Sequence, residues 1–187
     1  MSKPILLRNH PSTPAAIPVP WVRVGRDGNL LRLTFRMPGD TSMINLPARI
    51  EPKIKQSEQR RADLLWKHTC FECFVQPQDE VGYLEFNFSP SMEWAAYRFD
   101  AHREGMRDAD VECPAIVSTA WHNRFELSVR LALPEAWTPL DWRLNAAAII
   151  EETDGTKSYW ALAHPPGDPD FHHPDCFALE LPAPDGA

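Results

Sequence analysis

The sequence predicts an all-β domain, an antiparallel β-sandwich of about ten strands. Three observations support this prediction. Apolar and polar residues alternate with a period of two in several short runs, turn-forming residues bound each run, and no segment has the period of a regular helix. A chain of 187 residues is long enough to build one core. We therefore expect residues 1–187 to form a single domain with frayed ends, at about 1–18 and 182–187.

Alternating runs mark the expected strands. The clearest runs place an apolar side chain at every second position and cover residues 31–36, 70–75, 83–88 and 125–131. Turn-forming residues at 89–92 and 153–156 separate further runs of the same kind. These turns predict two hairpins, with strands at 82–88 and 94–100 and at 142–152 and 157–163.

Proline is the unusual component of the composition, with 19 residues against only 8 glycines. This is roughly twice the usual share of proline. Because proline has no backbone N–H to donate to a sheet, it favours stiff loops between short strands. The charged stretch 49–63 contains Pro52 and follows Pro47, and we expect it to be a loop with at most one helical turn.

Charge and hydropathy exclude several partners. The net charge is −7, and an acidic chain lacks the basic surface that binds nucleic acid or anionic membranes. No apolar stretch is long enough to span a membrane. Residues 1–21 are interrupted by prolines and resemble no signal peptide, so we expect a cytoplasmic protein. Its four cysteines are then expected to be free thiols.

The polar positions of the central strands are the first candidate site. Alternation places Glu72, Glu85 and Asn87 on the face opposite the apolar side chains of their strands. Across the turn at 89–92, we expect Trp94 and Arg98 to share this face. Such a surface suits a sugar, since rings stack on aromatic faces and charged groups hydrogen-bond to hydroxyls. The alternative is a solvated face with cross-strand ion pairs, such as Glu85 with Arg98.

The seven tryptophans and a histidine-rich loop supply further candidates. Trp66 and Trp160 lie at strand ends beside polar residues, where a ring can remain partly exposed. The loop at 164–175 contains four weak candidates for metal ligands, namely His164, His172, His173 and Asp175. We favour a rigid loop whose side chains cap its own backbone, because the loop lacks a metal-ligand spacing.

Motifs for catalysis or zinc binding are weak. Cys70 and Cys73 match C-x-x-C, but residues three apart on a strand face opposite sides of a sheet, so the thiols cannot share a site. The sequence has no nucleophile elbow, P-loop or dinucleotide-binding motif. Glu72 and Glu85 remain as a candidate acid/base pair for a small glycoside hydrolase.

Three longer segments carry a family resemblance. They are DLLWKHTCFECFV at 63–75, YLEFNFSPSMEWAAYRFD at 83–100 and YWALAHPPGDPDFHHPDCF at 159–177. Together they resemble the DOMON-like bacterial proteins, which are similar to family 9 carbohydrate-binding modules. The resemblance extends from about residue 21 to residue 181 and implies an immunoglobulin-like or jelly-roll β-sandwich.

The resemblance also implies a site. In the sugar-binding relatives two aromatic rings clamp a terminal sugar above polar side chains. Matching by motif places Trp66 at one ring, Glu72 at a polar contact and Arg98 at an arginine contact. The candidates for the second ring are Trp160 and Phe171, and the alternative is that Trp94 completes the platform instead.

We therefore predict a non-catalytic module that binds a small saccharide or the end of a glycan, with no nucleic-acid or membrane partner. No cofactor is expected, although calcium and haem stay open, because other DOMON domains bind haem through Met and His. The available side chains of these two types include Met92, Met106, His102 and His164. A haem- or metal-binding domain is thus the first alternative, and the carboxylate-dependent hydrolase is the second.

Overall fold

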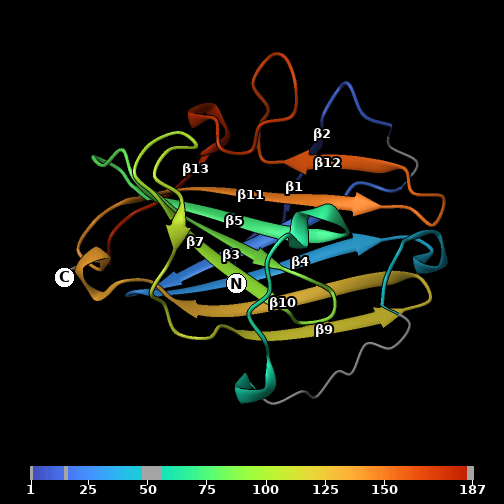
Figure 1. Cartoon of the computed structure of the whole chain (residues 1–187), viewed down its shortest axis with the longest axis horizontal. Helices are drawn as coiled ribbons and strands as arrows, with labels where there is room; N and C mark the ends of the chain where they lie inside the picture. The colour runs from blue at the N-terminus through green and yellow to red at the C-terminus, as the bar shows by residue number, and fades with distance from the viewer. Residues whose placement is uncertain (1, 15–16, 48–55, 185–187) are drawn as a thin grey trace.

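The computed structural model describes residues 2–14, 17–47 and 56–184. Two antiparallel sheets pack face to face (Figure 1), which confirms the predicted β-sandwich. The five-stranded sheet has the order β1 (Ile5–Leu6), β3 (Trp21–Asp27), β4 (Leu30–Pro38), β10 (Arg124–Ala132) and β9 (Ala115–Trp121). The eight-stranded sheet has the order β2 (Arg8–Asn9), β12 (Lys157–Ala161), β11 (Trp142–Glu151), β5 (Cys70–Pro77), β6 (Tyr83–Phe88), β7 (Trp94–Phe99) and β8 (Arg107–Asp108), with β13 (Leu179–Leu181) paired to β11.

Short connections complete the fold. In the described residues the helices are single 3₁₀ turns, and these are η1 (Thr41–Met43), η2 (Gln56–Glu58), η3 (Leu65–Lys67), η4 (Glu135–Trp137) and η5 (Pro174–Cys176). None of the described helices is long and apolar enough to cross a membrane. The helical turn expected within 49–63 is η2, while residues 48–55 lie outside the described part of the chain.

The main core fills the space between the two sheets. Its aromatic centre joins Phe71 on β5 to Phe125 on β10, whose rings stack with centroids 5.5 Å apart. Both side chains are fully buried. Removal of the apolar surface of such core residues from water is the main favourable contribution to folding.

A second apolar cluster covers the outer face of the eight-stranded sheet, the face turned away from the five-stranded sheet. It contains Phe74, Tyr97, Phe99 and Ile149 from the strands and Phe171 from the loop after β12. Strand β6 is consequently buried on both faces along its whole length. This contradicts the alternative of a solvated face, and Arg98 lies opposite Leu84 rather than Glu85.

The strands follow the predicted pattern closely. Ten of the described strands have three or more residues, and the other three have two each. The hairpins β6–β7 and β11–β12 form at the two predicted turns. The frayed start is wrong for residues 5–9, because β1 pairs with β3 and β2 pairs with β12. Residues 1, 15–16 and 185–187 of the predicted ends lie outside the described chain.

Side-chain alternation within strands is also confirmed. Cys73 packs in the main core, whereas the thiol of Cys70 faces Asn87 on the outer side. The cysteines are all free thiols. The expected exposure of Trp160, however, is wrong: its ring is 2% exposed in the main core, and its indole N–H donates to the hydroxyl of Ser158 at 2.8 Å.

We expect Trp160→Ala to lower the free energy of unfolding by about 3–5 kcal/mol, because it leaves a large cavity between the sheets. Urea unfolding measures this loss. Trp121→Ala is the matched control, since Trp121 is 38% exposed and packs on Arg124 at the surface, and it should cost about 1 kcal/mol or less. Equal losses in the two variants would contradict the assignment of Trp160 to the core.

Candidate functional site

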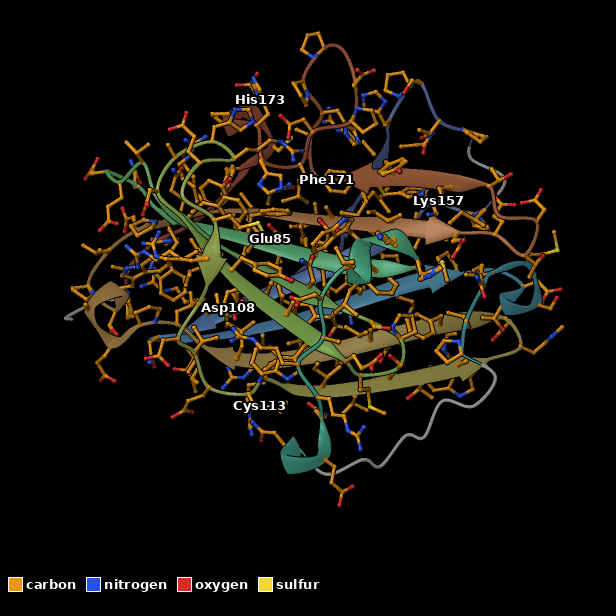
Figure 2. The ribbon with its side chains drawn as sticks, viewed as in Figure 1. Glu85, Asp108, Cys113, Lys157, Phe171 and His173 are labelled. Atoms are coloured by element: carbon orange, nitrogen blue, oxygen red, sulfur yellow. The ribbon has the colours of Figure 1, made fainter. Side chains whose placement is uncertain are left out.

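A pocket of about 340 Å³ opens on the outer face of the eight-stranded sheet. Two of the residues that line it, Glu85 and Phe171, are labelled in Figure 2. The strands form its base, and three loops form its walls. Its described lining consists of Trp66, Glu72, Glu85, Phe99, Arg103, Met106, Ile149, Tyr159, Pro169, Phe171 and His172.

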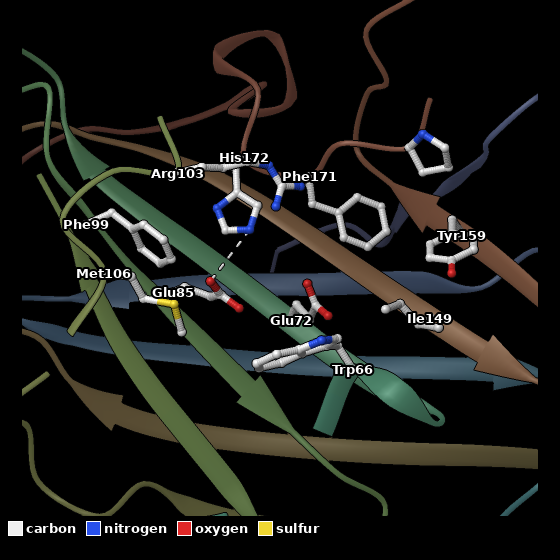
Figure 3. Close-up of a pocket in the computed structure, with 11 residues that line it drawn as sticks. Trp66, Glu72, Glu85, Phe99, Arg103, Met106, Ile149, Tyr159, Phe171 and His172 are labelled. Carbon is white, nitrogen blue, oxygen red and sulfur yellow. Dashed lines mark ion pairs between the residues drawn. The ribbon is translucent and has the colours of Figure 1, made fainter. Parts of the chain in front are cut away.

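Two carboxyl groups form the base of the pocket. Glu72 on β5 pairs in register with Asn87 on β6, and Glu85 lies two residues before Asn87. The two glutamates are therefore diagonal neighbours on the same sheet face. Figure 3 shows their carboxyl groups side by side, with Trp66 on one side and Arg103 and His172 on the other. Both residues are buried, with exposed fractions of 4% and 5%.

The two carboxyl groups differ in their hydrogen bonds. Glu85 accepts a hydrogen bond from the side-chain amide of Asn87 at 2.7 Å. Within the described residues, Glu72 has no hydrogen-bond or ion-pair partner. Its oxygens are not among the fully enclosed unpaired atoms of the described residues, so they face the open pocket. Glu72 is therefore the group in this pocket that is most available to a ligand.

Aromatic rings form the walls. Trp66 lies in η3, a turn that begins after Leu64, whose backbone has a φ of 61°. The Trp66 ring rests edge-on against Tyr97, with centroids 6.0 Å apart, and stays partly exposed. Phe171 and Tyr159 pack against each other at 6.1 Å on another side of the pocket. The pocket thus presents ring surfaces on more than one side of the carboxyl pair (Figure 3).

Asp170 joins the two loops that close the pocket. One of its carboxylate oxygens accepts hydrogen bonds from Nε and Nη2 of Arg103, at 3.0 and 2.8 Å. The other lies 2.8 Å from Nε2 of His102. Burial alone would raise the pKa of Asp170, but hydrogen bonds from His102 and Arg103 lower it overall. Asp170 is therefore ionised and offsets the charge of Arg103.

His172 is held as a neutral ring. The Tyr83 hydroxyl accepts a hydrogen bond from the backbone N–H of Arg103 at 3.2 Å and lies 2.8 Å from Nδ1 of His172. Burial raises the pKa of Tyr83 to about 12, so the hydroxyl keeps its proton. Burial, with a contribution from Arg103, lowers the pKa of His172 to about 4. Nε2 of its ring lies 3.7 Å from a carboxyl oxygen of Glu85.

Burial also favours the protonated form of the two glutamates. It raises the pKa of Glu85 to about 7, and burial together with the neighbouring Glu85 raises the pKa of Glu72 well above its usual range. Two carboxyl groups this close and this buried cannot both ionise freely. Near neutral pH the pair holds a proton that a ligand can displace or share.

Four predicted site residues meet in this pocket: Trp66, Glu72, Glu85 and Phe171. Asn87 lies beneath them and is completely buried, so it supports Glu85 rather than lining the pocket.

The expected positions of Trp94, Arg98 and Trp160 on this face are wrong. In register, Trp94 lies opposite Phe88 and Arg98 opposite Leu84, and Phe88 and Leu84 both belong to the main core. Trp160 likewise lies opposite Ala148, another core residue. The pocket instead receives Tyr159, the neighbour of Trp160 in the sequence. Strand alternation would have indicated Tyr159 once Trp160 was assigned to the core.

Arg103 was missed because it lies in the loop between β7 and β8, where no alternation indicates the direction of a side chain. Its backbone has a φ of 58°, a conformation that is uncommon outside glycine.

The candidate metal ligands do not gather in the structure. His164 contacts the carbonyl of Arg8 through Nε2, and His173 accepts a hydrogen bond from the N–H of Asp175 at the start of η5. His172 points into the pocket towards Glu85. The described residues contain no group of three or more His, Cys, Asp or Glu side chains placed to hold a metal ion.

The candidate haem ligands are also separated. Met92 is buried in the main core, and His102 is hydrogen-bonded to Asp170. Met106 lines the pocket.

Solved structures provide the comparison with known proteins. No family model matches the sequence, and no curated protein matches it either. A candidate carbohydrate-binding protein from Bacteroides uniformis superposes with a TM-score of 0.62 at 15% identity, over 93% of this chain and 82% of that one. A family 9 carbohydrate-binding module from Caldicellulosiruptor kristjanssonii, in complex with cellotriose, gives 0.60 at 9% identity, over 88% and 74% of the two chains.

A second structure, of a Caldicellulosiruptor kristjanssonii family 9 module with glucose, gives a TM-score of 0.51 at 8% identity, over 88% and 76% of the chains. These likenesses confirm the predicted resemblance to family 9 carbohydrate-binding modules at the level of the fold. The resemblance to DOMON-like proteins stays a prediction.

The pKa of Glu85 leads to a testable dependence of stability on pH. Its folded value of about 7 lies above the ordinary value of 4.5, so the folded state binds this proton more tightly than the unfolded state. Ionisation of Glu85 therefore opposes folding increasingly from about pH 4.5 to 7, and fully above that range. We expect Glu85→Gln to raise the free energy of unfolding at about pH 8 by about 1–3 kcal/mol, with a smaller gain at about pH 5.

Urea unfolding at the two pH values measures this difference. Glu112→Gln is the control, because Glu112 is exposed and lies outside the pocket lining. Glu112→Gln should change the free energy of unfolding only slightly, and by the same amount at both pH values. A Glu85→Gln protein that is no more stable than the wild type at about pH 8 would contradict the raised pKa.

Proposed function

We propose that this chain is a carbohydrate-binding module without a catalytic role, which holds a small saccharide or the end of a glycan in the pocket above Glu72 and Glu85. The observation that carries the proposal is the buried carboxyl group of Glu72, which has no described partner and lies between the rings of Trp66 and Phe171 (Figure 3). Donor groups from a ligand would complete its hydrogen bonds.

The two kinds of lining surface match the two kinds of surface on a sugar ring. The faces of a sugar carry C–H groups, which pack on aromatic rings such as Trp66, Tyr159 and Phe171. The edges carry hydroxyls, which can donate to the carboxyl oxygens and either donate to or accept from Nε2 of His172. The volume of about 340 Å³ is at the low end for ligand pockets, about 300–1,000 Å³. A ligand of one or a few rings is therefore favoured.

The structural neighbours support the same class of ligand. Two of them are family 9 modules, in complex with cellotriose and with glucose. Since fold alone does not imply function, the weight of the proposal rests on the pocket.

We expect glucose or cello-oligosaccharides to bind with a dissociation constant in the micromolar to millimolar range, which is typical of so small an interface. Trp66→Ala should weaken binding by about tenfold or more, because it removes one stacking surface. Titration calorimetry is the measurement of choice, since the substitution also removes a fluorophore.

Trp121→Ala serves as the control, because it removes a partly exposed tryptophan that does not line the pocket. The affinity of this variant for the sugar should equal that of the wild type. The proposal is wrong if the wild-type protein binds no sugar in a broad panel at tens of millimolar, or if Trp66→Ala binds as tightly as the wild type.

A further inference from the structure

The pocket has more hydrogen-bond acceptors than donors. Glu72 and Glu85 bring four carboxyl oxygens to its base. Among the described residues, the only hydrogen bond that reaches them comes from Asn87, and Nε2 of His172 lies 3.7 Å from Glu85. A ligand that completes these groups must be rich in donors.

The charges around the pocket do not balance. Arg103 is the one cationic side chain in the described lining, and Asp170 neutralises it through two hydrogen bonds. Burial, with a contribution from Arg103, keeps His172 neutral. The carboxyl pair at the base is left without a cation of its own, so burial favours its protonated form until a positively charged partner stabilises the ionised form.

The walls favour a cation as well. Trp66, Phe99, Tyr159 and Phe171 line the pocket around the carboxyl pair. The faces of aromatic rings carry partial negative charge and attract ammonium groups. An ammonium group also has three N–H donors and no acceptor, which matches the shortage of donors at the base.

We propose that the pocket selects a protonated amino sugar over a neutral sugar, with its ammonium group bound by Glu72 and Glu85 and its ring packed against Trp66. This inference rests on the proposed function and narrows the class of ligand. A neutral sugar supplies donors through its hydroxyls, but it brings no positive charge that would stabilise the ionised form of the carboxyl pair. An amino sugar supplies both the donors and the charge, and hydrogen bonds between charged groups are the stronger kind.

Calorimetric titration of the whole chain at about pH 6.5 tests the preference, since an amine with a pKa near about 7.7 is protonated there. The probes are glucose, N-acetylglucosamine, glucosamine and 6-amino-6-deoxyglucose, so that the position of the amine does not decide the result. We expect at least one amino sugar to bind about tenfold to a hundredfold more tightly than glucose and N-acetylglucosamine. The β-1,4-linked glucosamine dimer then distinguishes a chain end from the free sugar.

Glu72→Gln tests the origin of the preference, because the amide keeps the shape of the carboxyl group but cannot ionise to pair with an ammonium group. The ratio of amino-sugar affinity to glucose affinity should fall to about one in this variant. Glu112→Gln removes the same charge from an exposed position outside the pocket lining and should leave the ratio unchanged. Thermal unfolding of each variant confirms that it is folded.

The outcomes separate the inference from the proposed function. If glucose binds as tightly as both amino sugars, the inference is overturned while carbohydrate binding stands. The same holds if Glu72→Gln keeps the full preference, because the ammonium group would then lie elsewhere. If neither neutral nor amino sugars bind, both the proposed function and the inference are overturned.

Discussion

Burial of the central strands on both faces is the constraint on which the rest of the structure depends. Strands β5 and β6 are hydrogen-bonded on both sides within the sheet, so neither can rotate to expose one face. One face carries Phe71 and Phe86 into the core between the sheets. The alternation of side chains then places Glu72 and Glu85 on the other face. The sheet thus determines the face on which the carboxyl groups lie, and the loops that cover this face bury them.

The covering loops in turn depend on Asp170. Its hydrogen bonds to His102 and Arg103 join the loop after β7 to the loop after β12. The same residue accepts a hydrogen bond from the backbone N–H of His172. The walls of the pocket therefore come from segments nearly seventy residues apart in the chain, held by one carboxylate. A fixed frame of this kind reduces the entropy lost when a ligand binds.

Much of the fold and part of the site could be predicted from the sequence, and there is a physical reason why the rest could not. Within one strand, alternation specifies the face of each side chain, and Glu72, Glu85 and Asn87 are on the expected side. Across a turn, the face depends on how many residues the turn contains, which alternation does not reveal. The prediction shifted by one residue there, which moved Trp94 and Arg98 to the wrong face. The direction of Arg103 depends on loop contacts formed only in the folded chain.

The arrangement of the carboxyl pair determines the direction from which a ligand can approach it. Here both groups rise from one sheet face as diagonal neighbours on adjacent strands, so both approach a ligand from the same side. The side facing them is formed by Trp66, Phe171 and the loop of His172. Burial lowers the pKa of His172 to about 4, so it meets a ligand as a neutral ring. Such a pocket is suited to holding a ligand by complementary charge and ring stacking. Ligands should therefore differ in affinity according to their charge and their ring surface.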